Sequence, residues 1–317
     1  MRKSSTLTAA AVLTLLVAAC TSGGGASPAA SAEASLAPSV APSASAEVTP
    51  SPTPDACAKE SLALVAPGSL TIGTDNPAYP PYFEISDPAV DPWELGDPTN
   101  GKGFESAFAY ALAQQLGFAK DAVVWTYVPF DNSYAPGPKA FDIDVNQVSY
   151  KPERATAADL SDGYYFVNQA VVALKDTPAA AAKTIADLKP LKFGAQVGTT
   201  SYDTITNTIA PTTETAVFDT NDAAITSLSN GQIDAIVVDL PTAFYVTAAQ
   251  IDGGVIVGQF PSPTSADAEH FSVVLDKGSA LTACVNAAIA AMKADGSLDA
   301  ITKEWLSDKA SAPILTP

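Results

Sequence analysis

Residues that commonly build metal or nucleophilic centres are scarce in this sequence. The 317-residue chain has one histidine, His270, and three cysteines, Cys20, Cys57 and Cys284. They form no cluster of imidazoles and thiolates, so we predict no zinc or iron–sulfur site, and composition leaves only an all-oxygen metal site open. The chain also lacks G-x-S-x-G, a catalytic cysteine context, a P-loop and G-x-G-x-x-G. We therefore predict no catalytic residue and no cofactor.

Positive charge is scarce as well. The chain has 16 Lys and Arg against 34 Asp and Glu, a formal net charge of −18 at pH 7. A surface with this balance repels polyanions, so no nucleic-acid partner is expected. Apolar residues are abundant, at 47% of the total, which is enough for a sizeable buried core.

The N-terminus has the order of an export signal: basic Arg2 and Lys3, an apolar run that ends at Ala19, and then Cys20. The run is too short to span a bilayer, and its closing Val-Ala-Ala-Cys resembles a bacterial lipobox. We predict a lipoprotein signal peptide over residues 1–19 and lipidation of Cys20, which would anchor the exported protein to the outer face of the cell membrane. A conventional signal peptide with an incidental cysteine is the alternative.

Residues 20–56 are predicted to form a disordered Ala/Ser/Pro stalk. Of the 36 residues from Thr21 to Ala56, 30 are Ala, Ser, Pro, Thr or Gly, and they show no apolar period. Such a segment buries too little surface to offset its ordering entropy.

Two thiols remain once Cys20 is assigned to lipid. In an oxidising compartment the simplest prediction is a disulfide between Cys57 and Cys284. Two free buried thiols are the alternative.

Apolar periodicity alternates between strand and helix patterns after Cys57. Phe104, Phe108, Leu112 and Leu116 form one helical stripe that ends before Gly117. The alternation indicates an α/β fold with a parallel or mixed sheet. Strands are expected at 70–74, 122–128, 142–148, 193–197, 215–219, 233–239, 255–260 and 271–276, and helices at 104–116, 200–209, 222–230, 241–251, 280–295 and 298–307.

Arg154 is the first of three candidate ligand-binding features. It is the only arginine left after residues 1–19 are removed. A guanidinium offers a rigid fork of donors that holds a carboxylate through two parallel hydrogen bonds. An exposed arginine paired with Glu153 or Asp159 is the alternative, and composition does not decide between them.

The other two features lie where predicted strands end. Gly198 to Ser201 follow one strand and open a helix, so their amides and hydroxyls could hold an anion, or could simply cap the helix. Asp239 ends the strand 233–239 at the edge where open α/β sheets place ligands. Its alternative role is the N-cap of the helix that begins near Pro241.

Several short motifs occur in a fixed order along the chain. They are Gly73-Thr74-Asp75 with Tyr79-Pro80-Pro81-Tyr82, Gly103-Phe104-Glu105, the run from Ser149 to Arg154, the run from Ser161 to Tyr165, Gly198-Thr199-Thr200, the run from Gly231 to Ala235, and the closing Lys293–Ser297 and Ile301–Trp305. In this order they resemble the solute-binding proteins of polar amino acid ABC transporters, known as solute-binding protein family 3. The resemblance runs from about Leu70 to Leu306.

The resemblance implies a two-lobed fold of the type II periplasmic-binding class. Lobe 1 would comprise residues 57–168 and 260–317, and lobe 2 would comprise residues 169–259. Two hinge strands would join the lobes, near Val167 to Ala170 and near Gly258 to Pro263.

The resemblance also implies a set of ligand-binding residues. Arg154 and Thr200 match positions that hold the ligand α-carboxylate, and Asp239 matches the position that takes the α-ammonium. Tyr79 and Phe130 match aromatic residues that enclose the ligand side chain. Gln147 and Ser149 are further expected ligand-binding residues, and Asp75, Tyr82, Asn146 and Thr199 are secondary candidates.

The chain departs from the family pattern close to this site. Lys151 replaces a threonine, Tyr150 replaces a small aliphatic residue, and Asn146-Gln147 stands where Gly or Ser is frequent. The segment from Tyr134 to Lys139 interrupts what is commonly a helix. These departures affect specificity, so the identity of the amino acid is not readable from the sequence.

The function implied is that of a membrane-anchored receptor that captures a polar amino acid and delivers it to an ABC transporter permease. A slight preference for basic or amide side chains is expected, since Asp75 lies near the aromatic residues and the protein is acidic. A dehydratase-like enzyme on the same fold and a sensor input domain are the alternatives.

Overall fold

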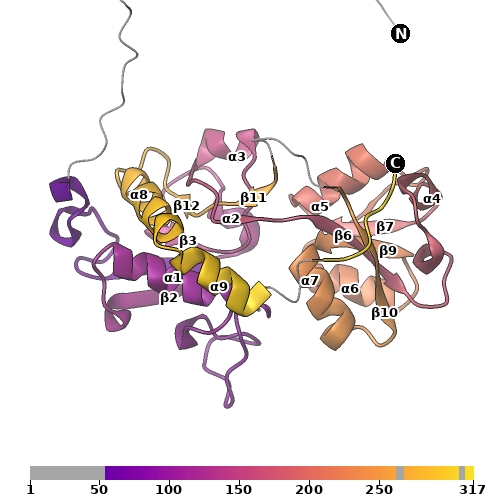
Figure 1. Ribbon diagram of the computed structural model, residues 1–317, viewed down its shortest axis with the longest axis horizontal. Helices are drawn as coiled ribbons and strands as arrows, with labels where there is room; N and C mark the ends of the chain where they lie inside the picture. Colours follow the sequence, from indigo (N-terminus) through magenta and orange to yellow (C-terminus); the bar gives the residue numbers. More distant parts are fainter. Residues whose placement is uncertain (1–53, 262–267, 307–310) are drawn as a thin grey trace, which may run out of the picture. The chain divides into compact units, whose positions relative to one another are not determined.

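The computed structural model describes residues 54–261, 268–306 and 311–317 (Figure 1). The predicted signal peptide, Cys20 and all of the predicted stalk up to residue 53 lie outside the described residues. No helix in the described ranges has the length and apolar character needed to cross a membrane.

Lobe 1 is built on a mixed five-stranded sheet with the order β2-β1-β3-β12-β4. The first three strands are parallel, and β12 runs antiparallel to both of its neighbours. The strands are β1 (Leu70–Thr74), β2 (Val123–Tyr127), β3 (Ile143–Asp144), β4 (Asp159–Leu160) and β12 (Val274–Leu275). A separate antiparallel pair joins β5 (Tyr165–Phe166) to β11 (His270–Phe271).

Three helices, α1 (Phe104–Gln115), α8 (Leu281–Ala294) and α9 (Ser297–Leu306), pack together in lobe 1 (Figure 1). The predicted stripe of α1 is buried, because Phe104, Phe108 and Leu112 have no exposed surface. Two short helices, α2 (Phe130–Ser133) and α3 (Pro152–Ala157), follow the strand ends of this lobe.

The predicted Cys57–Cys284 disulfide is present. Cys284 lies on the buried face of α8, and Cys57 belongs to a short 3₁₀ helix, Pro54–Cys57, at the start of the described chain. The bond therefore fastens the end of the predicted stalk to the core of lobe 1.

Lobe 2 is built on a second five-stranded sheet with the order β10-β6-β9-β7-β8. Strands β7, β8 and β9 are parallel, while β6 runs antiparallel to β9 and β10. The strands are β6 (Gln169–Leu174), β7 (Phe193–Gln196), β8 (Ala216–Phe218), β9 (Ala235–Asp239) and β10 (Gly254–Gln259). The helices are α4 (Ile185–Leu188), α5 (Thr200–Asp203), α6 (Asn221–Ser229) and α7 (Leu240–Tyr245), and π-helical turns extend α5 as η6 (Thr204–Ile209) and α7 as η7 (Val246–Gln250).

Most of the predicted elements are present, and the short strands β4 and β5 and the short helices α2, α3 and α4 are additional. The expected strand 142–148 contains only the two residues of β3, and the expected strand 271–276 is divided between β11 and β12. Strand β6 was not predicted as a strand of lobe 2, although it pairs with two neighbours and its first five residues are buried.

The C-terminal tail differs from its predicted place. Residues 311–317 follow lobe 1 in the chain but pack on lobe 2, where the Leu315 amide donates to the Gln259 carbonyl at 2.9 Å. The Leu315 and Phe260 side chains are buried in the apolar core of lobe 2. The prediction placed residues 260–317 in lobe 1. Its first residue, Phe260, and its last segment, 311–317, instead belong to lobe 2, because Phe260 and Leu315 are buried against the sheet of lobe 2.

Candidate functional site

A cavity of about 180 Å³ is lined by residues of both lobes. Its polar lining follows the carboxyl ends of parallel strands: β1 and β3 in lobe 1, and β7, β8 and β9 in lobe 2. This is the edge at which open α/β sheets place ligands. Ten of the eleven predicted ligand-binding residues line it: Asp75, Tyr79, Phe130, Asn146, Gln147, Ser149, Arg154, Thr199, Thr200 and Asp239.

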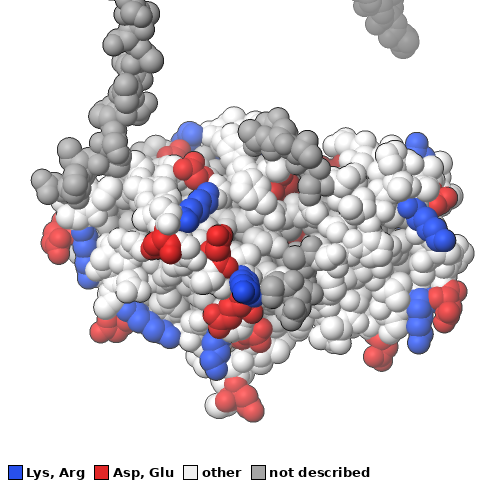
Figure 2. All heavy atoms as spheres, in the orientation of Figure 1, with Lys and Arg blue, Asp and Glu red and all other residues white. Residues whose placement is uncertain are grey.

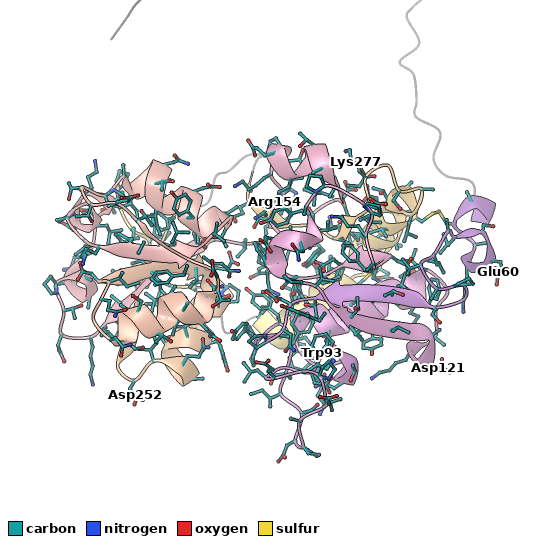
Figure 3. The ribbon with its side chains drawn as sticks, turned by 180° about the vertical axis from the view of Figure 1, so that it is seen from behind. Glu60, Trp93, Asp121, Arg154, Asp252 and Lys277 are labelled. Atoms are coloured by element: carbon teal, nitrogen blue, oxygen red, sulfur yellow. A yellow bond between two sulfur atoms is a disulfide. The ribbon has the colours of Figure 1, made fainter. Side chains whose placement is uncertain are left out.

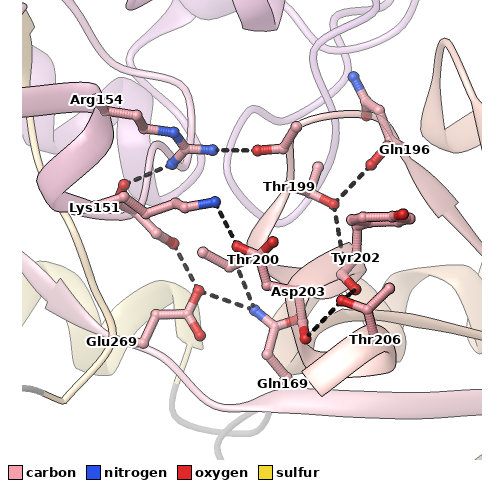
Figure 4. Close-up of polar contacts among 12 residues, drawn as sticks. Lys151, Arg154, Gln169, Gln196, Thr199, Thr200, Tyr202, Asp203, Thr206 and Glu269 are labelled. Carbon is pink, nitrogen blue, oxygen red and sulfur yellow. Dashed lines mark hydrogen bonds and ion pairs between the residues drawn. The ribbon is translucent and has the colours of Figure 1, made fainter. Parts of the chain in front are cut away.

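Arg154 lies on α3 and is only 5% exposed. Its Nη1 donates to the Ser149 carbonyl at 2.6 Å, and its Nη2 donates to the Gly198 carbonyl in lobe 2 at 2.8 Å (Figure 4). The guanidinium carbon lies 5.4 Å from the centre of the Phe130 ring and 4.4 Å from that of Tyr134. Burial lowers the pKa of Arg154.

The alternative of an exposed Arg154 paired with Asp159 is wrong. Asp159 lies instead beside Lys277, whose Nζ is 3.3 Å from its Oδ1. Figure 3 shows Arg154 on the side of lobe 1 that faces lobe 2, while Lys277 lies farther from lobe 2. The guanidinium fork is therefore at the cavity, where it can meet a ligand.

The start of α5 supplies hydroxyl groups from lobe 2. Thr199 is the N-cap, because its Oγ1 accepts from the Tyr202 amide at 3.2 Å. The capping alternative thus holds for Thr199, while the Thr200 hydroxyl stays in the cavity lining, 3.4 Å from the Gln169 Nε2 atom. Gly198 has φ +75, and a Cβ there would come within 2.8 Å of the Tyr134 hydroxyl, so both conformation and space favour glycine.

Asp239 ends β9 and precedes α7. Asp239 occupies the N-cap position of α7, but its side chain makes no capping hydrogen bond to that helix. Its Oδ1 accepts instead from the Gln169 Nε2 atom at 2.6 Å. Burial and the neighbouring Glu269 carboxylate raise the pKa of Asp239 well above its usual range.

Gln169 and Glu269 are polar residues of this region that the sequence analysis missed. Gln169 begins β6 and is 4% exposed, and its Nε2 also donates to Glu269 Oε1 at 3.1 Å. The same Glu269 oxygen accepts from the Ser149 hydroxyl at 2.8 Å. Both residues lie where the chain passes between the lobes. Neither belongs to one of the sequence motifs, so the sequence did not indicate a role in binding.

Gln147 is hydrogen-bonded to Glu105, a fully buried residue of α1. The Gln147 backbone amide donates to Glu105 Oε1 at 2.7 Å, and its side-chain Nε2 donates to Oε2. Tyr164 donates its hydroxyl to the same carboxyl group. Burial raises the pKa of Glu105 to about 7. The amide nitrogen of Gln147 is thus engaged by Glu105.

Tyr82 is the predicted site residue that the structure places elsewhere. Its side chain is 1% exposed and packs in the core of lobe 1, with its ring centre 6.0 Å from that of Phe271. Only its hydroxyl approaches lobe 2, at 3.4 Å from Thr242 Oγ1. Apolar packing thus takes up the ring, and Tyr82 is not among the residues that line the cavity.

Acidic residues dominate the charge of the cavity lining. Asp75, Asp131, Asp219 and Asp239 line it, and Arg154 is the one basic residue among the lining residues. Burial raises the pKa of Asp75, which follows β1. On the face drawn in Figure 2 basic side chains stand among acidic ones without gathering into a patch. The cavity lining therefore carries more acidic than basic side chains.

Two further contacts join the lobes beside the cavity. Lys151, which replaces the threonine of the family motif, forms an ion pair with Asp203 of α5 (Figure 4). The Tyr79 ring centre lies 6.5 Å from that of Tyr245 in α7. Tyr79 and Lys151 thus approach lobe 2 from lobe 1 at the cavity margin.

This chain is similar to several known proteins that are named for binding amino acids. L-cystine-binding protein TcyJ of Escherichia coli K12 is 30% identical over 75% of this chain and 82% of its own length. ABC transporter arginine-binding protein 1 of the same strain is 29% identical over 72% of this chain and 86% of its own. The solved structure of a solute receptor for L-cysteine of Neisseria gonorrhoeae is 25% identical, with a TM-score of 0.63 over 78% of this chain and 95% of that one.

The fold and the order of the sequence motifs agree with the protein family that this sequence matches. Residues 84–308 fit the family described as bacterial extracellular solute-binding proteins, family 3. This span includes the whole sheet of lobe 2, every strand of the lobe 1 sheet except β1, and most of the cavity residues. The chain belongs to the bacterial extracellular solute-binding proteins of family 3.

Proposed function

We propose that this protein captures an L-amino acid in the cavity between its lobes and delivers it to the permease of an ABC transporter. The observation that carries the proposal is the convergence of Arg154, the start of α5 and Asp239 on one cavity. A cationic fork, a set of hydroxyl donors and a carboxylate are the complement of a zwitterion. The relatives are named as binding proteins for amino acids, which supports the same class of ligand.

The α-carboxylate of the ligand would lie against the Arg154 guanidinium and the Thr200 hydroxyl. The two Arg154 nitrogens donate to backbone carbonyls, so the carboxylate would take over or share these donors. Asp239 would accept from the α-ammonium through Oδ2, because Oδ1 already accepts from Gln169. Tyr79 and Phe130 would contact the ligand side chain.

Within this class we propose a preference for basic amino acids. Arg154 offsets the α-carboxylate and Asp239 offsets the α-ammonium, which leaves Asp75, Asp131 and Asp219 in the lining without a counter-charge from the other lining residues. A cationic side chain would supply that charge, and an aromatic face can also stabilise it. The arginine-binding relative supports this preference, whereas the cystine- and cysteine-binding relatives bind amino acids with other side chains.

A thermal-shift screen of the common L-amino acids tests the proposed function. Ligand-stripped protein should melt at a higher temperature with L-arginine or L-lysine, because a ligand at about a hundred times its dissociation constant adds roughly 2.7 kcal/mol of stability. D-Arginine is the control of equal charge and size. If no L-amino acid raises the melting temperature, the proposed function is wrong.

We also propose that the exported protein is anchored by lipid on Cys20. The support is the sequence of residues 1–20 and the Ala/Ser/Pro composition that follows them, and these residues lie outside the described ranges. Membrane fractions should retain the wild type and lose a Cys20→Ser variant. Equal release of both exported proteins would overturn the anchor and leave the binding function unaffected.

A further inference from the structure

Two carboxylates from different parts of the fold meet at a single amide group. Asp239 lies at the end of β9 in lobe 2, and Glu269 lies next to β11 in lobe 1, where the chain returns from lobe 2. The Nε2 atom of Gln169 donates to Asp239 Oδ1 at 2.6 Å and to Glu269 Oε1 at 3.1 Å (Figure 4). The Oε1 atom of Gln169 accepts from the Ser201 hydroxyl at 2.7 Å. This hydrogen bond orients the amide so that its NH₂ group faces the two acids.

The pair has little counter-charge around it. Among the described residues, Lys151 and Lys277 form the ion pairs, with Asp203 and Asp159 respectively, and neither Asp239 nor Glu269 takes part in one. A neutral amide can donate two hydrogen bonds but cannot cancel two negative charges. Asp239 and Glu269 are both only partly exposed, and two carboxylates that share one amide donor favour a state in which one proton is retained.

The other titratable groups that face the pair do not remove this excess of negative charge. Arg154 supplies one positive charge that acts on both acids, but Glu105 adds a further acid, so the acidic groups outnumber the guanidinium. The hydroxyls of Tyr82 and Tyr165 face Asp239 and are neutral at physiological pH, since burial raises both pKa values. His270 follows Glu269, and its ring stacks on Tyr150 while its Nδ1 lies 2.9 Å from the Ala268 carbonyl.

We propose that Glu269 is a positioning residue of the α-ammonium site, which acts through Gln169, and that the Asp239–Glu269 pair holds one proton that an incoming amino acid expels. The proposal rests on the proposed function. The ligand-free pair would carry one carboxyl group and one carboxylate. When the α-ammonium arrives, the carboxyl O–H bond breaks, the proton passes to solvent, and both oxygen groups face the ammonium as carboxylates. The two acids and the ammonium together then carry one negative charge, the same charge that the two acids carried before binding.

The sign of the pH dependence follows from this exchange. The free protein binds one more proton than the complex, so affinity falls as the pH drops below the pKa of the ligand-free pair. In that range the dissociation constant should rise about tenfold per pH unit. The raised pKa of Asp239, caused by burial and by Glu269, places the effect above the usual range of an aspartate.

Calorimetric titration with L-arginine between pH 5 and pH 8.5 tests the proposal, with L-glutamine as a second probe. Titrations in buffers of different ionisation enthalpy count the protons released, and the wild type should release up to one. Glu269→Gln keeps the shape and the acceptor oxygen but removes one charge, so it should show a nearly flat pH profile and little proton release. Glu153→Gln, at an exposed glutamate beside Arg154, is the matched control and should behave as the wild type.

The outcomes separate this inference from the proposed function. Proton release by the wild type that disappears in Glu269→Gln supports the pair. If the wild type binds L-arginine without releasing protons, or if Glu269→Gln keeps the wild-type pH profile, the inference is wrong. If Glu269→Gln keeps the wild-type pH profile, Glu105, whose pKa is about 7, would be the source of the pH dependence. If neither probe binds at any pH, the proposed function fails as well.

Discussion

Replacing Arg154 by alanine should weaken the binding of L-arginine by about 2 to 5 kcal/mol, which is roughly 30-fold to several thousand-fold. The guanidinium is 5% exposed, so its removal would leave the α-carboxylate of the ligand without its partner in a partly dry cavity. Arg154→Lys should not restore the affinity, because an ammonium is a point charge and cannot reproduce two parallel hydrogen bonds. Calorimetric titration of purified variants measures the loss.

The control for this experiment must carry the same loss of charge outside the cavity. Lys293→Ala meets this need, since Lys293 is exposed on α8 of lobe 1. It should bind L-arginine as tightly as the wild type. Arg154 also joins the lobes through the Gly198 carbonyl, so the melting temperature of each ligand-free variant should be recorded to show that it folds. Wild-type affinity in Arg154→Ala would contradict the proposed carboxylate site.

Removing the disulfide should produce the largest loss of stability among simple changes to this chain. The two cysteines are separated by 227 positions, and the chain-entropy model gives up to about 5 kcal/mol for so long a loop. The variant Cys57→Ser, Cys284→Ala should melt on the order of 10 °C lower than the wild type in differential scanning calorimetry.

Reduction provides an independent check of the disulfide. Wild-type protein unfolded and reduced before refolding should match the double variant, while the variant itself should not respond to reductant. Thiol titration of denatured, unreduced wild type should detect no free thiol from Cys57 or Cys284. Equal melting temperatures for oxidised wild type and the variant would show that the bond contributes nothing to stability.

The local parts of the fold were predictable from sequence because their signals are local. The α1 stripe of Phe104, Phe108 and Leu112 repeats at helical spacing, and all three residues are fully buried. Strand β9 reads as a continuous apolar run and is central in its sheet. The cavity residues were predictable only through the order of the motifs, since Arg154 and Asp239 each had an equally plausible structural alternative.

The parts that were missed depend on tertiary contacts between distant segments. Strand β6 overlaps the expected hinge strand at Gln169 and Ala170, and it is held as a strand of lobe 2 by pairing with β9 and β10. Gln169 and Glu269 are 100 positions apart and acquire a role only when the chain returns to lobe 1. Leu315 gives no sign in the sequence that its burial lies in lobe 2. Neither periodicity nor residue type carries this information.

The claim that most needs a direct measurement is that one cavity recognises both charged groups of an amino acid. Titration of the ligand-stripped wild type with L-arginine, agmatine and argininic acid tests it, because agmatine lacks the α-carboxylate and argininic acid has a hydroxyl in place of the α-ammonium. The account predicts that L-arginine binds and that each analogue binds weaker by about 2 kcal/mol or more, roughly 30-fold. Agmatine or argininic acid binding as tightly as L-arginine would contradict it.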